Sequence, residues 1–177
     1  MPLTIPRPAA SEYAPYFAPY VAKVPEGDIL ELLAHQIDET TTMLGGLNDQ
    51  QAAFRYAPGK WSVKQVVGHL TEAERVFSYR ALCFARGDAT PLPGWDENAY
   101  VANAHYDRRS MSALVADLRA ARASTISLFR GFDGEELERA GTANNKLYSV
   151  RSIAYITAGH EQHHVDIIRA RYLAGAR

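Results

Sequence analysis

Ala158-Gly159-His160-Glu161-Gln162-His163-His164, near the end of the chain, contains three of the six histidines among 177 residues. The stretch lies inside residues 149–173, where apolar side chains recur at helical spacing and Ser149 is placed to cap the first turn. We expect this segment to form the last and longest helix. A helix that packs in a core has no ordinary reason to carry so many imidazoles, so these histidines indicate a functional site.

The positions of the three histidines around this helix differ. On a helical wheel centred on His160, His164 falls on the same narrow face as Ile153 and Ile167. His163 falls to one side of that face. The sequence therefore predicts that His160 and His164 point into the core, and that His163 contacts an outer group or a partner surface.

Three further segments show the same apolar spacing, over residues 28–47, 62–86 and 110–130. Ser62 with Gln65 fits a capping box at the start of the second of them. Four long helices with short punctuated loops predict an all-α fold, a four-helix bundle. A length of 177 residues suffices for one domain over residues 1–177 with a sizeable core.

The connections between these helices are less regular. Residues 1–25 are rich in proline and aromatic residues, so we expect an extended N-terminal strap, with room for a helical turn, packed on the domain or on a second subunit. Residues 87–109 form a long helix 2–3 connection of a kind that is often functional, with a short helix expected over 95–104. A single turn is expected over 133–138 and a loop over 142–147.

Composition narrows the class of protein. Apolar residues make up 47% of the chain, charged residues 22%, and the formal net charge is -1. This is typical of a globular protein and lacks the basic excess that nucleic-acid binding needs. Cys83 is the single cysteine, so no intramolecular disulfide forms and we expect a cytoplasmic setting. Neither a signal peptide nor a membrane-spanning run is recognisable, so no membrane partner is expected.

The inward histidines suit a metal. Residues i and i+4 on a helix lie side by side, so His160 and His164 can ligate one ion, and neutral imidazole is a common ligand of zinc, nickel and iron. His69, mid-helix among apolar neighbours, is the candidate third ligand. Three histidines with one position left for water make an open, catalytic-type site. The alternative is that each histidine is a hydrogen-bonded core residue. This alternative suits one histidine better than three, because uncompensated imidazoles in a core are energetically costly.

A protease motif is also present. His160-Glu161-Gln162-His163-His164 matches the H-E-x-x-H pattern of zinc metalloproteases. The only acidic residue after His164 is Asp166, and no sheet is predicted that would hold a peptide. We therefore interpret the match as accidental.

Other chemistry-bearing residues are weaker candidates. Glu72 lies three residues after His69, where it can orient a ligand or accept a proton. The alternative is that Glu72 is a carboxylate at the edge of the bundle without a functional role. Cys83 is too far along the helix from His69 to be a ligand or nucleophile. His35 and His105 are expected on the surface or in a loop.

Two segments carry a resemblance to a known family. Residues 60–70, Lys-Trp-Ser-Val-Lys-Gln-Val-Val-Gly-His-Leu, and the late Gly-His-Glu-Gln-His-His at 159–164 resemble the DinB-like metalloprotein family, which includes bacillithiol- and mycothiol-dependent transferases. The resemblance implies a four-helix bundle with a divalent metal held at one end by three histidines, which match His69, His160 and His164. It also implies that homodimers are common, and it leaves the reaction open.

Three functions remain in view. The first is an enzyme in which a low-molecular-weight thiol binds the open metal position and its thiolate attacks a small electrophile, with Arg151, Trp95 and Tyr100 as candidate cofactor-binding residues. The second is a hydrolase that uses metal-bound water, with Glu72 or Glu161 as the base. The third is a non-catalytic, metal-stabilised dimeric module.

Overall fold

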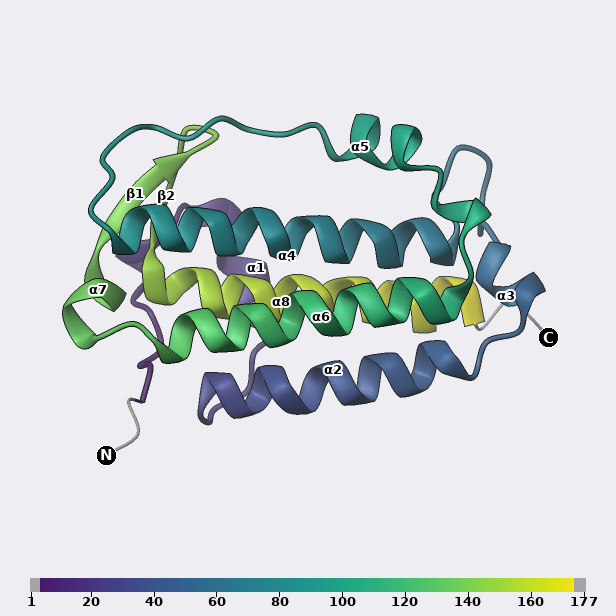
Figure 1. Ribbon diagram of the computed structural model, residues 1–177, viewed down its shortest axis with the longest axis horizontal. Coiled ribbons are helices and arrows are strands. Elements are labelled where there is room, and N and C mark those ends of the chain that lie inside the picture. Colours follow the sequence, from purple (N-terminus) through teal and green to yellow (C-terminus); the bar gives the residue numbers. More distant parts are fainter. Residues whose placement is uncertain (1–3, 174–177) are drawn as a thin grey trace.

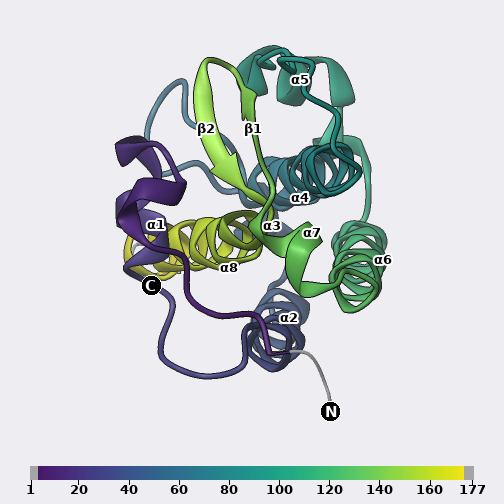
Figure 2. The same cartoon turned by 90° about the vertical axis from the view of Figure 1, so that its left-hand side faces the viewer.

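The computed structural model describes residues 4–173, and four long helices dominate it (Figure 1). They are α2 (Ile29–Gly45), α4 (Val63–Ala85), α6 (Met111–Arg130) and α8 (Val150–Ile167). Both α4 and α2 pack against α6 and α8, so the four helices close a bundle that Figure 2 shows end-on. The predicted four-helix bundle is confirmed.

Side-chain caps set the starts of these helices. The Ser62 hydroxyl accepts a hydrogen bond from the Gln65 N–H, and the Gln65 side chain accepts one from the Ser62 N–H, which is the predicted capping box. The side chains of Asp28, Ser110 and Ser149 also accept hydrogen bonds from first-turn N–H groups of α2, α6 and α8, without the reciprocal bond of a capping box. Beyond Ile167 the last helix continues as a π-helical segment, η4 (Ile168–Leu173).

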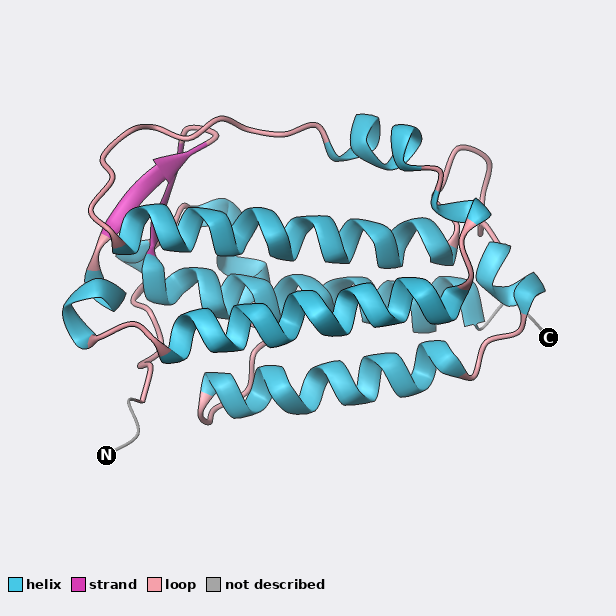
Figure 3. Ribbon diagram, in the orientation of Figure 1, coloured by secondary structure: helices cyan, strands magenta, loops and turns pink. Residues whose placement is uncertain are grey.

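The loop predicted over 142–147 is wrong. The chain forms an antiparallel hairpin of β1 (Ala140–Ala143) and β2 (Lys146–Ser149), the only strands in the described residues (Figure 3). Asn144 and Asn145 make the two-residue turn, and both have positive φ, at 50° and 56°. Asparagine tolerates this conformation, and a turn of this kind matches the twist of the paired strands. The fold is therefore helical with one small hairpin at the end where α4 finishes.

Short helices occupy the connections. The segment over residues 48–60, where the sequence indicates only a turn at Pro58-Gly59, contains α3 (Asp49–Ala53). The long connection after α4 contains α5 (Glu97–Ala104) and η3 (Tyr106–Arg108), as expected for 95–104. The single turn expected over 133–138 is α7 (Gly134–Glu138). No helix in the described part of the chain is long and apolar enough to cross a membrane.

The N-terminal strap packs on the bundle, but it is less extended than expected. It contains η1 (Ala10–Glu12), η2 (Pro15–Phe17) and α1 (Ala18–Val21). Phe17 and Val21 are buried in the core, and α1 lies along α8 on the side away from α6 (Figure 2). The strap thereby brings Tyr20 against the helix that carries His160.

A glycine permits this contact. A Cβ on Gly159 would lie 2.0 Å from the carbonyl oxygen of Tyr20. We expect Gly159→Ala to push the strap from α8 and lower the free energy of unfolding by about 1–3 kcal/mol, as overpacking does. Chemical denaturation measures this, with Gly45→Ala as the control because nothing lies within 4 Å of a Cβ there. Equal stability of the two variants would show that the strap is not clamped at Gly159.

A buried ion cluster crosses the bundle. Arg122 on α6 is 1% exposed and donates to both carboxylate oxygens of Glu74 on α4, at 2.7 and 3.0 Å. It also bonds Glu161 on α8 and the carbonyl oxygen of Leu33 on α2. One guanidinium therefore ties all four long helices together.

Candidate metal centre

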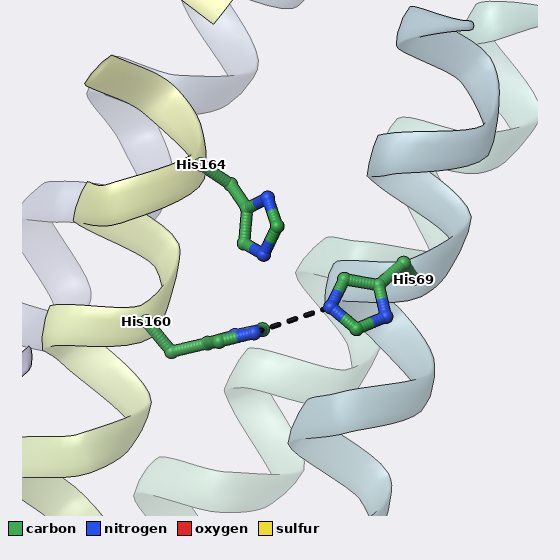
Figure 4. Close-up of side chains that lie close together, drawn as sticks. All are labelled: His69, His160 and His164. Carbon is green, nitrogen blue, oxygen red and sulfur yellow. Dashed lines mark hydrogen bonds between the residues drawn. The ribbon is translucent and has the colours of Figure 1, made fainter. Parts of the chain in front are cut away.

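Three histidines from two helices meet inside the bundle (Figure 4). His69 comes from α4, and His160 and His164 come from successive turns of α8. One ring nitrogen from each lies within 4.8 Å of the other two, and the Nε2 atoms of His69 and His160 are 3.2 Å apart. The structure thus assembles the trio that the sequence spacing selects.

One pair of the trio has the spacing of two ligands on a tetrahedral divalent ion. Zinc–nitrogen bonds of about 2.0–2.1 Å at tetrahedral angles place two ligand nitrogens roughly 3.3 Å apart. The 3.2 Å between the Nε2 atoms of His69 and His160 is close to this value. The donor set is entirely imidazole, which suits zinc, nickel and iron.

Burial keeps these imidazoles neutral. It lowers the pKa of His69 to about 4 and that of His164 to about 3. Burial and then the neighbouring histidines hold the pKa of His160 well below its ordinary value. Neutral imidazole is the form that binds a metal, so the trio is ready to do so at neutral pH.

Aromatic rings pack around the ligand rings on several sides. Trp95 stacks on His69 with ring centroids 5.7 Å apart and planes 13° from parallel. The ring centroid of Trp61 lies 4.8 Å from that of the same imidazole. The Nδ1 of His69 is buried without a hydrogen-bond partner in the described residues. Tyr20 and Phe77 pack edge-on against His160 at 5.6 and 5.7 Å. The strap and the long connection therefore each supply a wall of the site.

A cavity of about 110 Å³ opens beside His69 and His160. Its walls come from the strap, α4, the connection before α5, the start of α5, the hairpin and α8. They consist of Tyr16, Phe17, Tyr20, His69, Ala73, Phe77, Arg80, Trp95, Glu97, Asn144, Lys146, Tyr148 and His160. The volume is below the roughly 300–1,000 Å³ of sites for larger ligands. The cavity therefore suits a small molecule.

A second cavity, of about 230 Å³, reaches the trio from the other side. It touches His164 and is lined by Lys60, Trp61 and Tyr172 among others. The three histidines thus lie between two hollows, and also between the two apolar clusters of the core.

The candidate cofactor-binding residues separate in the structure. Trp95 lines the cavity beside His69. Tyr100 does not line it, and contacts Trp95 edge-on at 5.2 Å. The expectation for Arg151 is wrong, because its guanidinium bonds Glu12 at 2.6 and 2.7 Å and so holds the strap instead of facing the cavity. Sequence spacing could not reveal this pairing across most of the chain.

The candidate carboxylates also lie elsewhere. Glu72 is absent from the lining of the cavity and lies by the hydroxyl of Tyr106, whose pKa it helps to raise after burial. Glu161 is buried and bonded to Arg122, so the protease-like base is not available. Among the described residues, Glu97 is the one carboxylate that lines the cavity, a residue that sequence reasoning missed.

The remaining candidates agree with expectation. His163 lies beside the trio with its ring against Tyr20, at 5.4 Å. His35 is exposed on α2, and His105 lies between α5 and η3. Cys83 is a free, partly buried cysteine near the end of α4 and lines neither cavity that touches the trio.

Fold and site together define a class of protein, a four-helix bundle with an internal three-histidine centre suited to a divalent metal. The sequence matches the DinB superfamily over residues 32–168, and the chain belongs to that superfamily. It is 28% identical over 153 residues to a protein of Oceanobacillus iheyensis described as a proposed metal-dependent hydrolase, covering 83% of this chain and 87% of that one.

A solved structure shares the fold. YfiT from Bacillus subtilis, described as a probable metal-dependent hydrolase with an unusual four-helix bundle topology, superposes with a TM-score of 0.74. The match covers 83% of this chain and 87% of YfiT, at 17% identity. At that identity the likeness establishes the bundle topology alone.

Proposed function

We propose that this protein is a metal-dependent hydrolase of small molecules, in which His69, His160 and His164 hold one divalent ion. The observation that carries the proposal is the meeting of three neutral ring nitrogens within 4.8 Å of one another beside a small cavity. A divalent ion bound there supplies a Lewis acid and lowers the pKa of a water molecule. The names of the two relatives agree with this reaction class.

The chain itself would supply binding and proton transfer. Phe77 and Trp95 give the cavity an aromatic part of its wall against which the apolar part of a substrate can pack. Burial and then the charge of Asp96 raise the pKa of the Glu97 carboxyl, which brings it nearer the range useful for a general base. We assign Glu97 the role of accepting a proton from the attacking water.

Glu97→Gln tests this role. We expect kcat for hydrolysis to fall by about 10²–10⁴-fold, the usual contribution of general base catalysis, while metal content stays unchanged. Glu72→Gln is the matched control, because Glu72 lies by the Tyr106 hydroxyl and does not line the cavity. A loss of activity in the Glu72 variant alone would assign the base to that residue.

A thiol-dependent S-transferase is the second candidate. Arg80 and Lys146 line the cavity, and basic side chains beside the centre are what an anionic thiol cofactor would need. The bound ion would lower the pKa of such a thiol as it would that of water. Zinc, nickel and iron all remain suitable for either reaction.

One screen separates the two candidates. Native protein of known metal content is assayed against small esters, amides and lactones, and against small electrophiles with several low-molecular-weight thiols. We expect turnover of the first group without any thiol, and loss of that turnover in His69→Ala. Turnover that appears only when a thiol is added would favour S-transfer over hydrolysis.

A further inference from the structure

Arg80 is a buried cation without an anionic partner. It is 4% exposed, and its guanidinium donates to the hydroxyl of Tyr148 at 3.1 Å and to the carbonyl oxygen of Pro93 at 3.2 Å. No carboxylate among residues 4–173 lies within 4.0 Å of it. A buried charge that is not paired is costly, so a fold retains one only with compensation.

The same molecule shows how it neutralises a buried arginine. Arg122, which is 1% exposed, bonds both Glu74 and Glu161. Arg80 has two neutral acceptors in their place, and the guanidinium group carries five N–H donors. Donors therefore remain for an acceptor that the chain does not supply.

Arg80 also faces the cavity of the three histidines. His69, Ala73, Phe77 and Arg80 recur at helical spacing on one face of α4, and all four line that cavity. From His69 to Arg80 the helix rises roughly 16 Å. Lys146, from the hairpin, lines the same cavity and lies over the Tyr16 ring at 4.9 Å. The cavity thus has the histidines on one part of its wall and two cationic side chains on another.

We propose that the cavity selects small molecules that carry a compact oxyanion, a carboxylate or a phosphate, which Arg80 binds with help from Lys146. Arg80 would hold this group through paired N–H donors, and so orient the rest of the molecule toward His69 and His160. The orienting role rests on the proposed function, whereas oxyanion binding at Arg80 does not depend on it.

The direct test measures anion binding to the native protein and uses a substitution only to assign one signal. Acetate and inorganic phosphate are titrated separately into the full-length native protein, and the Nε–H signals of arginine side chains are followed by ¹⁵N NMR. Arg80→Lys identifies the Arg80 signal by its loss. We expect that signal to shift and saturate with at least one of the two anions, and the better probe names the oxyanion. No shift with either anion would overturn the proposal.

Affinity measurements then assign the contact. We expect Arg80→Gln to weaken binding of the better anion by about ten- to a hundredfold, as loss of charge-assisted hydrogen bonds does, with a smaller loss in Lys146→Gln. Arg119→Gln is the control, because Arg119 is exposed and pairs with Asp38 away from the cavity. Unchanged affinity in a folded Arg80→Gln would contradict the assignment. If the protein binds metal but the Arg80 signal does not shift with either anion, this inference fails and the proposed function does not. If the Arg80 signal shifts but the protein binds no metal, only the proposed function fails.

Discussion

Removal of any one histidine of the trio is expected to empty the metal centre. His69→Ala, His160→Ala and His164→Ala should each reduce bound metal from about one ion per chain to near background. Each change leaves two imidazoles where a stable site needs at least three protein ligands. The loss in affinity should exceed the roughly 10–100-fold that follows removal of a group that merely orients a ligand.

Elemental analysis of purified variants measures this directly. His163→Ala is the matched control, since His163 is adjacent in sequence to His164 but lies outside the trio. It should keep its metal. Thermal unfolding adds a second reading, because added metal raises Tm only where the folded state binds it. Retention of metal in both His69→Ala and His164→Ala would refute the ligand assignment.

The second large effect is expected at Arg122. Arg122→Met leaves the carboxylates of Glu74 and Glu161 buried without their cation. Breaking a buried pair in this way costs about 3–5 kcal/mol of stability, so the variant should unfold at much lower denaturant concentration. Arg119→Met, one turn earlier on α6, removes an exposed pair with Asp38 and should cost about 1 kcal/mol or less.

The pH dependence of Arg122→Met gives an independent check. Burial raises the pKa of Glu74, and Arg122 is the group that opposes this shift in the intact protein. Without Arg122 the folded-state pKa of Glu74 lies further above its unfolded value. Stability of the variant should therefore rise as pH falls through that raised pKa, because protonation removes the unpaired charge. If the variant loses stability on mild acidification, as many proteins do, the account of this cluster is wrong.

Local signals in the sequence were sufficient to predict the four long helices of the bundle. The caps at Asp28, Ser62 and Ser149 and the apolar spacing that follows them are properties of neighbouring residues, so the starts of these helices could be predicted. The hairpin was missed because β1 is only four residues long and contains small residues without clear alternation. Asn144-Asn145 was its one signal, since two residues that tolerate positive φ suit a two-residue turn.

In the candidate site too, local spacing could be predicted from the sequence and long-range contacts could not. His160 and His164 could be paired from their spacing on one helix, and His69 from its place on an apolar face. Contacts between distant segments left no such signal. The bond of Arg151 to Glu12, the pairing of Arg122 with Glu161 and the stacking of Trp95 on His69 all depend on how whole elements dock.

The same limit explains why the cavity was not foreseen. Glu97 and Arg80 are ordinary charged residues in the sequence, and only Arg80 shares a helix face with a histidine, His69. Only the packing of the strap, the long connection and the hairpin around α4 makes them part of one wall. Partial burial raises the pKa of Glu97, and the hydrogen bonds of Arg80 go to two neutral acceptors.

X-ray absorption at the metal edge of the native protein, purified without chelators, tests the central claim most directly. We predict one divalent transition metal with three imidazole nitrogens at about 2.0–2.1 Å, if it is zinc, and at least one oxygen donor from solvent. That result would match an ion held by three histidines with a position open for chemistry, and the three alanine variants assign it to His69, His160 and His164. Protein that binds no metal, or a ligand sphere without imidazole, would contradict the account.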